Sequence, residues 1–180
     1  MNESIKRVLL DETTIHARIE TLAAEITEDY RGQDLTVVAI LNGSIIFSAD
    51  LLRHIPLPLK IDGWRASSYA GTESTGQITL GQTSVAELRG RHILLLDDIL
   101  DTGLTLSAVK NHLVSTSEAL SVKTCVLLRK DVPRSHAVEA DYVGFDIPNE
   151  FVVGYGLDYN EKYRNLPYIG ILTDEAIARG

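Results

Sequence analysis

The sequence predicts an α/β protein with a twisted, mostly parallel β-sheet that is flanked by helices. Short uninterrupted apolar runs are typical of strands that are buried on both faces of a sheet. Between these runs lie segments whose apolar residues recur at helical spacing, and this alternation indicates parallel strands joined by helices. The chain has 180 residues, of which 44% are hydrophobic and 23% charged, and we expect a single domain over residues 1-180.

The first part of the chain predicts a helix, a strand and a second helix. Apolar residues recur at helical spacing from Ile15 to Ile26, after the capping candidates of "DETT" and before Gly32, a plausible stop. "LTVVAIL" at residues 35–41 predicts a buried strand that "NGS" ends. "IIFSADLLRHI" at residues 45–55 predicts a helix, which the prolines of "IPLPLK" terminate.

The rest of the chain continues the alternation after one long polar loop. The loop, residues 67–77, is rich in Gly, Ser and Thr, and so long a loop is usually mobile or functional. The predicted elements around it are the strands "LKIDGWRAS", "HILLLDD", "SVKTCVLLR" and "DYVGFDIP" and the helix "LTLSAVKNHLV".

Composition excludes several classes of protein. The single cysteine, Cys125, rules out an intrachain disulfide and lies inside the apolar "TCVLL", where a buried structural role is expected. No stretch approaches the roughly 20 apolar residues of a membrane span, and the N-terminus lacks the pattern of a secretory leader. We therefore expect a cytoplasmic protein without a membrane partner. The net charge of −8 argues against a broad nucleic-acid-binding face.

Three carboxylates gather where an apolar run ends, in "HILLLDDILDTGLTL". Asp97 and Asp98 are adjacent, and Asp101 follows after two apolar residues. Buried neighbouring carboxylates are costly and repel each other, so they need a metal, hydrogen-bond donors or solvent. One aspartate alone would suffice to cap the next helix. In a sheet of this kind ligands bind beyond the carboxyl ends of the strands, which makes the cluster a candidate site.

The turn after these acids predicts a phosphate site. Backbone N–H groups of "DTGLT", with the hydroxyls of Thr102 and Thr105, can converge on a phosphate at a helix N-terminus. Carboxylates beside the same phosphate would repel it. The two features agree if the amides meet the phosphate while the acids face hydroxyl groups or a base. A sugar phosphate has this polarity.

These residues carry a resemblance to a known family. Four apolar residues followed by "DDILDTGLT" resemble the phosphoribosyl-pyrophosphate (PRPP) motif of the type I phosphoribosyltransferases. "SSYAGTESTG", "LLRKDVPRS" and "YVGFDIPNEFVVGYGLDYNEKYRNLPYIG" are similar to the hypoxanthine-guanine branch, so the resemblance extends from about Val37 to Ile171. It implies the type I phosphoribosyltransferase fold, with a small hood built from the N-terminal segment and about residues 145-180.

The resemblance also implies an activity. Members of this branch transfer the phosphoribosyl group of PRPP to N9 of hypoxanthine or guanine, which gives IMP or GMP and pyrophosphate. The expected cofactor is Mg²⁺, and the expected assembly is a homodimer or homotetramer.

By resemblance, the acidic motif binds the sugar phosphate. Asp97 and Asp98 would contact the ribose hydroxyls, directly or through Mg²⁺. Asp101 would lie near purine N7, which makes it the candidate general acid or base. The 5′-phosphate would be held by the amides and hydroxyls of Asp101, Thr102, Gly103, Leu104 and Thr105.

By resemblance, the downstream segments bind the base and the pyrophosphate. Lys130 would donate to the oxygen at purine C6, Phe151 would stack on the ring, and Val152 would offer main-chain groups. Without the family, "FVVGY" is simply an apolar strand. Asp158 would hold Mg²⁺ on the pyrophosphate, and Arg164 would meet the pyrophosphate itself.

Two further loops complete the implied site. "ILNGS" would form the pyrophosphate loop, in which Gly43 permits a close backbone approach and relatives often have a cis peptide just before it. Asn42 departs from the pattern, because many relatives carry lysine or arginine there. Ser68 and Tyr69 match the loop that closes over the reacting groups and excludes water.

Two other functions compete with this interpretation. An aspartate-based phosphotransferase also places acids after an apolar strand, but usually with one residue between them and after the first strand. A regulator with the same fold would bind a nucleotide or RNA without turnover. The acidic charge and the presence of Asp101, Asp158 and Arg164 count against pure regulation.

Overall fold

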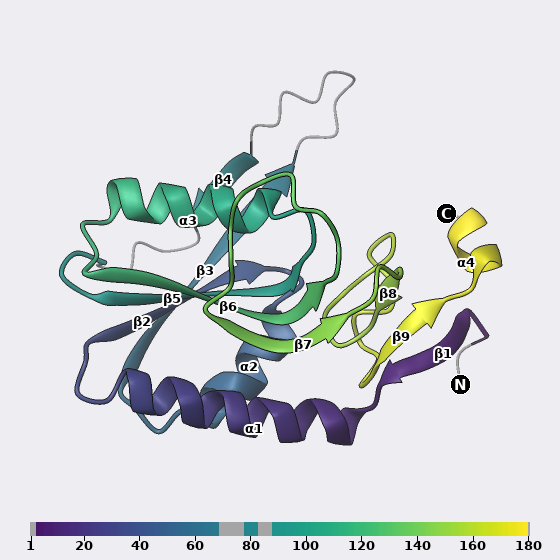
Figure 1. Cartoon of the computed structure of the whole chain (residues 1–180), viewed down its shortest axis with the longest axis horizontal. Coiled ribbons are helices and arrows are strands. Elements are labelled where there is room, and N and C mark those ends of the chain that lie inside the picture. The colour runs from purple at the N-terminus through teal and green to yellow at the C-terminus, as the bar shows by residue number, and fades with distance from the viewer. Residues whose placement is uncertain (1–2, 69–77, 83–87, 180) are drawn as a thin grey trace.

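The computed structural model describes residues 3–68, 78–82 and 88–179 of the chain. Its centre is a six-stranded sheet in which five strands are parallel and the edge strand β4 is antiparallel to β3 (Figure 1). Their spatial order is β4 (Ile78–Gln82), β3 (Leu59–Ser68), β2 (Leu35–Leu41), β5 (His92–Leu100), β6 (Ser121–Lys130) and β7 (Tyr142–Ile147). The predicted parallel sheet is confirmed.

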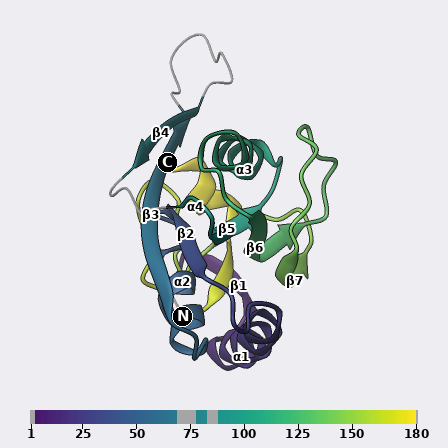
Figure 2. The ribbon, with the colours of Figure 1, turned by 90° about the vertical axis from the view of Figure 1, so that its left-hand side faces the viewer.

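Helices cover both faces of this sheet. The helices α1 (Glu12–Asp29) and α2 (Ile45–Arg53) lie on one face and α3 (Leu104–Thr116) lies on the other (Figures 1 and 2). Burial on both faces explains the uninterrupted apolar sequence of strand β5. Leu94 and Leu96 pack into the core beneath α1 and α2, whereas Leu95 packs with Val109 beneath α3. Both faces of the strand are therefore buried.

A second, smaller sheet joins the two ends of the chain. Its strands are β1 (Ile5–Leu10), β9 (Ile169–Leu172) and β8 (Val152–Val153), in that order and antiparallel, and the short helix α4 (Asp174–Ala178) follows β9. Figure 1 shows this sheet beside the carboxyl ends of the central strands. We call this sheet, together with α4 and residues 148–168, the hood. The expected hood built from chain ends is present.

The signals predicted at the two ends of the first helix are a cap in "DETT" and a stop at Gly32, and the helix lies between them. Asp11 is the N-cap of α1, and its carboxylate accepts a hydrogen bond of 2.8 Å from the Thr14 amide. The helix ends at Asp29, and Gly32 follows in the left-handed conformation, with φ of +74°. The N-terminus therefore uses a residue type that helix starts favour, while the C-cap is Tyr30 and Gly32 lies two residues beyond it.

Several element boundaries differ from the expectation. Strand β5 continues to Leu100, two residues beyond the predicted end at Asp98, so Asp97 and Asp98 lie within the strand as predicted. "FVVGY" is a strand only at Val152–Val153, and α2 ends at Arg53 instead of residue 55. Strand β3 ends at Ser68, one residue beyond the predicted strand, because residues 67 and 68 pair with β4. Strands β1, β4 and β9 and helix α4 were not predicted, since each depends on long-range pairing or is very short.

Within the described residues, no helix is both long enough and apolar enough to cross a bilayer.

The burial of Cys125 predicts that its thiol is unreactive in the native protein. The residue is fully buried in β6, and burial raises the pKa of its thiol far above the ordinary value. Since the thiolate is the reactive form, a maleimide or disulfide reagent is expected to leave the native protein unlabelled and to label it fully in denaturant. Mass spectrometry of the labelled chain checks this. Rapid labelling of the folded protein would mean that β6 opens locally.

Candidate active site

The acidic motif lines a cavity at the carboxyl ends of β2 and β5. The cavity has a volume of 240 Å³ and is lined by the end of β2, by Gly43 and by the whole run from residue 97 to residue 106. Every residue that the sequence assigned to ribose phosphate binding is in this lining: Asp97, Asp98, Asp101, Thr102, Gly103, Leu104 and Thr105. The strand, the turn and the start of α3 therefore present one continuous surface.

Gly103 sets the shape of the phosphate turn. It is the N-cap of α3 and has a φ of +83°, a conformation that favours glycine. A Cβ at this position would lie 2.8 Å from Cγ1 of Val138 and 2.9 Å from the backbone oxygen of His136. The tight turn aims the first amides of a 13-residue helix at the cavity, where the helix end favours an anion.

Asp97 and Asp98 are both poorly exposed, and the pKa of Asp97 is raised more strongly than that of Asp98. Only 5% of Asp97 is accessible, and its carboxylate accepts a 3.0 Å hydrogen bond from the Asp98 amide. Burial raises the pKa of Asp97 well above its usual range, and the charge of Asp98 raises it further. Burial also raises the pKa of Asp98, which accepts from the Ile99 amide at 2.9 Å. Two negative charges here need a cation or donors from a ligand.

Gly43 lies directly against Asp98. A Cβ on Gly43 would lie 1.8 Å from Oδ2 of Asp98, so only glycine fits without displacing the carboxylate. The loop begins with a cis peptide bond between Leu41 and Asn42, and Gly43 follows directly. Asn42 itself is exposed, whereas Gly43 lines the cavity.

A second cavity adjoins the first and contains the residues assigned to the base. It has a volume of 210 Å³ and shares Asp98, Ile99 and Asp101 with the first cavity. The rest of its lining comes from β6 and the hood: Lys130, Phe151, Val152, Leu157 and Asp158. The sequence did not single out Ile99 or Leu157. Ile99 lies inside the acidic motif and Leu157 beside Asp158, so their neighbours were the only available signal.

Lys130 and Asp101 form an ion pair in this second cavity. The ammonium of Lys130 donates to Oδ2 of Asp101 at 3.0 Å, and the lysine side chain is 12% exposed against 44% for the aspartate. The pair presents a donor and an acceptor side by side. Phe151, which is 43% exposed, meets Tyr159 edge to face with ring centroids 5.2 Å apart. An exposed aromatic beside a polar pair suits a planar ligand.

Asp158 and Arg164 are paired at the hood edge of the site. Their charged groups are 2.8 Å apart, and Arg164 also donates to the backbone oxygen of Gly156 at 2.9 Å. The charge of Arg164 lowers the pKa of Asp98, against the larger effect of burial. The arginine therefore acts electrostatically on the acidic motif as well as on Asp158.

The predicted loop residues are only partly described. Ser68 is the last residue of β3, so the backbone places it at the carboxyl edge of the sheet. Tyr69 lies outside the described residues.

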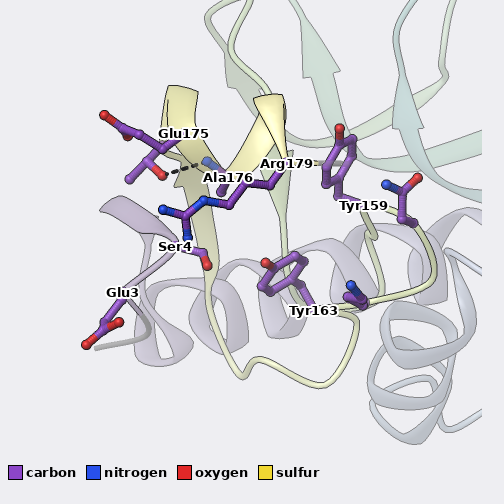
Figure 3. A pocket seen from close by; sticks show the side chains of 10 residues that line it. Glu3, Ser4, Tyr159, Tyr163, Glu175, Ala176 and Arg179 are labelled. Atoms are coloured by element: carbon purple, nitrogen blue, oxygen red, sulfur yellow. Dashed lines mark hydrogen bonds between the residues drawn. The ribbon is translucent and has the colours of Figure 1, made fainter.

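A larger cavity, of 470 Å³, lies in the hood (Figure 3). In this view Tyr159 and Tyr163 lie to one side of the Arg179 side chain, and Glu3 and Glu175 lie to the other. Among the described residues that line it, two are acidic and two are basic: Glu3, Glu175, Lys162 and Arg179. None of the residues assigned to the site lines it. Volume alone therefore does not identify the reacting centre, whereas the converging carboxylates and amides do.

Comparison with known proteins identifies the family. The model of the phosphoribosyl transferase domain matches residues 8–160. The hypoxanthine-guanine phosphoribosyltransferase of Streptococcus pneumoniae (strain ATCC BAA-255 / R6) is 46% identical over 176 residues, which cover 97% of each chain. The hypoxanthine-guanine-xanthine phosphoribosyltransferase of Tritrichomonas foetus is 41% identical, over 97% of this chain and 95% of its own.

Solved structures agree in fold. A hypoxanthine phosphoribosyltransferase from Staphylococcus aureus superposes with a TM-score of 0.89 at 44% identity, over 97% of this chain and 95% of that one. The Trypanosoma cruzi hypoxanthine phosphoribosyl transferase gives a TM-score of 0.91 at 36% identity, over 99% and 97%. The predicted type I fold is thereby confirmed. This chain belongs to the phosphoribosyl transferase domain family, in its hypoxanthine-guanine phosphoribosyltransferase branch.

Proposed function

We propose that the two adjoining cavities bind PRPP and a 6-oxopurine, and that the chain transfers the phosphoribosyl group to purine N9 in a purine salvage reaction. The observation that carries this proposal is the shared wall of Asp98, Ile99 and Asp101 between a phosphate turn and a base site. A ribose placed at this wall has its phosphate end toward α3 and C1′ toward the base. The relatives' names, which specify hypoxanthine and guanine, support the same substrates.

The ion pair of Lys130 and Asp101 selects the base. In a 6-oxopurine with a hydrogen on N7, the oxygen at C6 accepts and the adjacent N7–H donates. This edge complements the ammonium of Lys130 and the carboxylate of Asp101, which lie 3.0 Å apart. Adenine presents an amino group at C6, which would face the ammonium with a donor instead of an acceptor. Hypoxanthine and guanine share the favoured edge.

The proposed reaction follows from this placement. The lone pair of N9 forms the bond to C1′ of the ribose, while the bond from C1′ to the pyrophosphate oxygen breaks and its electrons leave with pyrophosphate. Asp101 accepts the proton that N7 loses as the base becomes part of the nucleotide. The Phe151 ring holds the plane of the base, so positioning supplies much of the rate.

Mg²⁺ suits the donors of the site. Within residues 3–68, 78–82 and 88–179, no three Asp, Glu, His or Cys side chains form a complete metal cage. Mg²⁺ commonly binds through one or two carboxylates and substrate phosphates instead, and Asp97, Asp98 and Asp158 are the carboxylates available. When bound, it would neutralise charge on PRPP and on the departing pyrophosphate. Gly43 and Arg164 would meet the pyrophosphate, while Asn42 brings no charge.

The assembly remains a proposal. In one structural relative, the Trypanosoma cruzi hypoxanthine phosphoribosyl transferase, the C-terminal region has a role in the oligomeric state. We expect a homodimer or a homotetramer for this chain.

Asp101→Asn tests the proton-transfer role. Asparagine keeps the size of the side chain but accepts a proton poorly, so kcat for hypoxanthine with PRPP and Mg²⁺ is expected to fall by about 100-fold or more. The KM for PRPP is expected to stay within about threefold, because the binding amides remain. Pyrophosphate release measures both constants. An unchanged kcat would remove Asp101 from this role, and a wild-type protein without turnover on any purine would refute the proposed function.

Lys130→Met tests base selection. Loss of a charged donor to the oxygen at C6 is expected to reduce the preference for IMP over AMP by about 10- to 100-fold in Kd. Calorimetric titration of the two nucleotides measures this ratio. Lys123→Met is the control, since Lys123 pairs with Asp29 at 3.0 Å on another part of the surface. A ratio that changes equally in both variants would contradict the assignment.

Gly43→Ala tests the close packing of the pyrophosphate loop. The added methyl group must displace the Asp98 carboxylate, so kcat is expected to fall by about 100-fold. Gly32→Ala is the control: its φ of +74° makes alanine costly, by about 1 kcal/mol, but a Cβ there meets nothing within 4 Å. Its turnover is expected to match the wild type. Full activity of Gly43→Ala would show that the loop adapts without cost.

A further inference from the structure

We propose that Tyr155 is a positioning residue for the pyrophosphate end of the site and acts through its hydrogen bond to Asp50; this inference rests on the proposed function. Tyr155 is not among the described residues that line either cavity, and only 3% of it is exposed. Its phenol donates a hydrogen bond to Oδ2 of Asp50. The two residues belong to different parts of the molecule, the hood and helix α2.

The backbone around Tyr155 needs such an anchor. Gly154, Tyr155 and Gly156 are three successive residues with positive φ, of 100°, 50° and 102°. Glycine adopts this region freely, but a tyrosine there is uncommon. The Tyr155 amide donates to Leu166 O at 2.8 Å, and the Gly156 amide donates to Arg164 O at 2.9 Å. The phenol adds a side-chain hydrogen bond to Asp50.

The turn at Tyr155 touches the pyrophosphate loop. A Cβ on Gly156 would lie 2.1 Å from the backbone oxygen of Gly43, so the two backbones are in direct contact. The backbone oxygen of Gly156 accepts from Arg164, which pairs with Asp158. Movement of this turn would therefore displace Gly43 and both charged residues assigned to the pyrophosphate.

Asp50 lies in the helix that follows the same loop. This helix, α2, begins at Ile45, directly after the loop residue Ser44. The Asp50 side chain is 17% exposed and is held by Arg53 and, at 3.6 Å, by the imidazole of His16 in α1. Burial, and the hydrogen bond to Asp50, raise the pKa of Tyr155, so the phenol keeps its proton at neutral pH. The hydrogen bond thus ties the hood turn and the helix after the loop into one unit.

Tyr155→Phe tests the inference, with Tyr142→Phe as its matched control. Tyr142 is also buried, with 7% exposed, and its phenol donates to a helix carboxylate, that of Asp29, which belongs to neither cavity lining. Both variants lose one phenol-to-carboxylate hydrogen bond. Tyr155→Phe is expected to weaken binding of magnesium pyrophosphate about tenfold by calorimetry. Tyr142→Phe is expected to leave that affinity unchanged.

Kinetics separate positioning from general damage. In Tyr155→Phe the KM for PRPP is expected to rise about tenfold, while the KM for hypoxanthine stays within about twofold. Asp50→Ala is expected to reproduce this pattern, and the double variant is expected to add nothing further. Asp50→Asn, which keeps an acceptor oxygen, is expected to restore most of the wild-type affinity.

Either of two results would overturn the inference. One is wild-type pyrophosphate affinity in Tyr155→Phe, and the other is an equal loss in Tyr142→Phe. Since the affinity measurement requires no turnover, it decides the role of Tyr155 even if the wild-type protein proves inactive with every purine, a result that would refute only the proposed function.

Discussion

The site depends on the close packing of Gly43, which lies against the Asp98 carboxylate and against the backbone of Gly156. The distances allow no side chain at Gly43 or at Gly156, since a Cβ would lie 1.8 Å from the carboxylate or 2.1 Å from the Gly43 oxygen. Three segments far apart in the sequence meet at this point: the loop after β2, the end of β5 and the hood. The same packing joins the hood to the loop that we propose for pyrophosphate binding.

Local charge explains how an acidic protein would bind PRPP, the polyanionic substrate of the proposed reaction. The net charge is −8, and three aspartates lie in the acidic motif. Helix α3 presents its N-terminus to the cavity, where a bound phosphate would need no side-chain cation. The cations that do occur are already paired, Lys130 with Asp101 and Arg164 with Asp158. These pairs hold each donor in place before a ligand arrives, which reduces the ordering that binding would otherwise require.

The fold was predictable where the determinants are local. Helix α1 follows from its helical apolar spacing and from the Asp11 cap, and β5 follows from an apolar run that is buried on both faces. The phosphate turn was predictable because an acidic strand end, Gly103 and a following helix are adjacent in sequence. Family resemblance, rather than periodicity, supplied the roles of Lys130, Phe151 and Asp158, and it indicated that they belong to one site.

The contacts that sequence reasoning missed are long-range. Strand β1 forms only because β9 pairs with it across almost the whole chain, and β8 is too short for any periodicity to reveal. Lys130 meets Asp101 across 29 positions, and Tyr155 meets Asp50 across 105. Side-chain pairs of this kind depend on the packed fold, and the sequence carries no local pattern that marks them.

A crystal structure with IMP and Mg²⁺ bound tests most directly whether the acids and the amides of the turn bind opposite ends of one ribose phosphate. We expect the 5′-phosphate at the amides of residues 101–105 and the ribose hydroxyls facing Asp97 and Asp98. We also expect the oxygen at C6 on Lys130 and the base against Phe151. A phosphate bound elsewhere, or a base seated in the hood cavity between Tyr159 and Arg179, would contradict it.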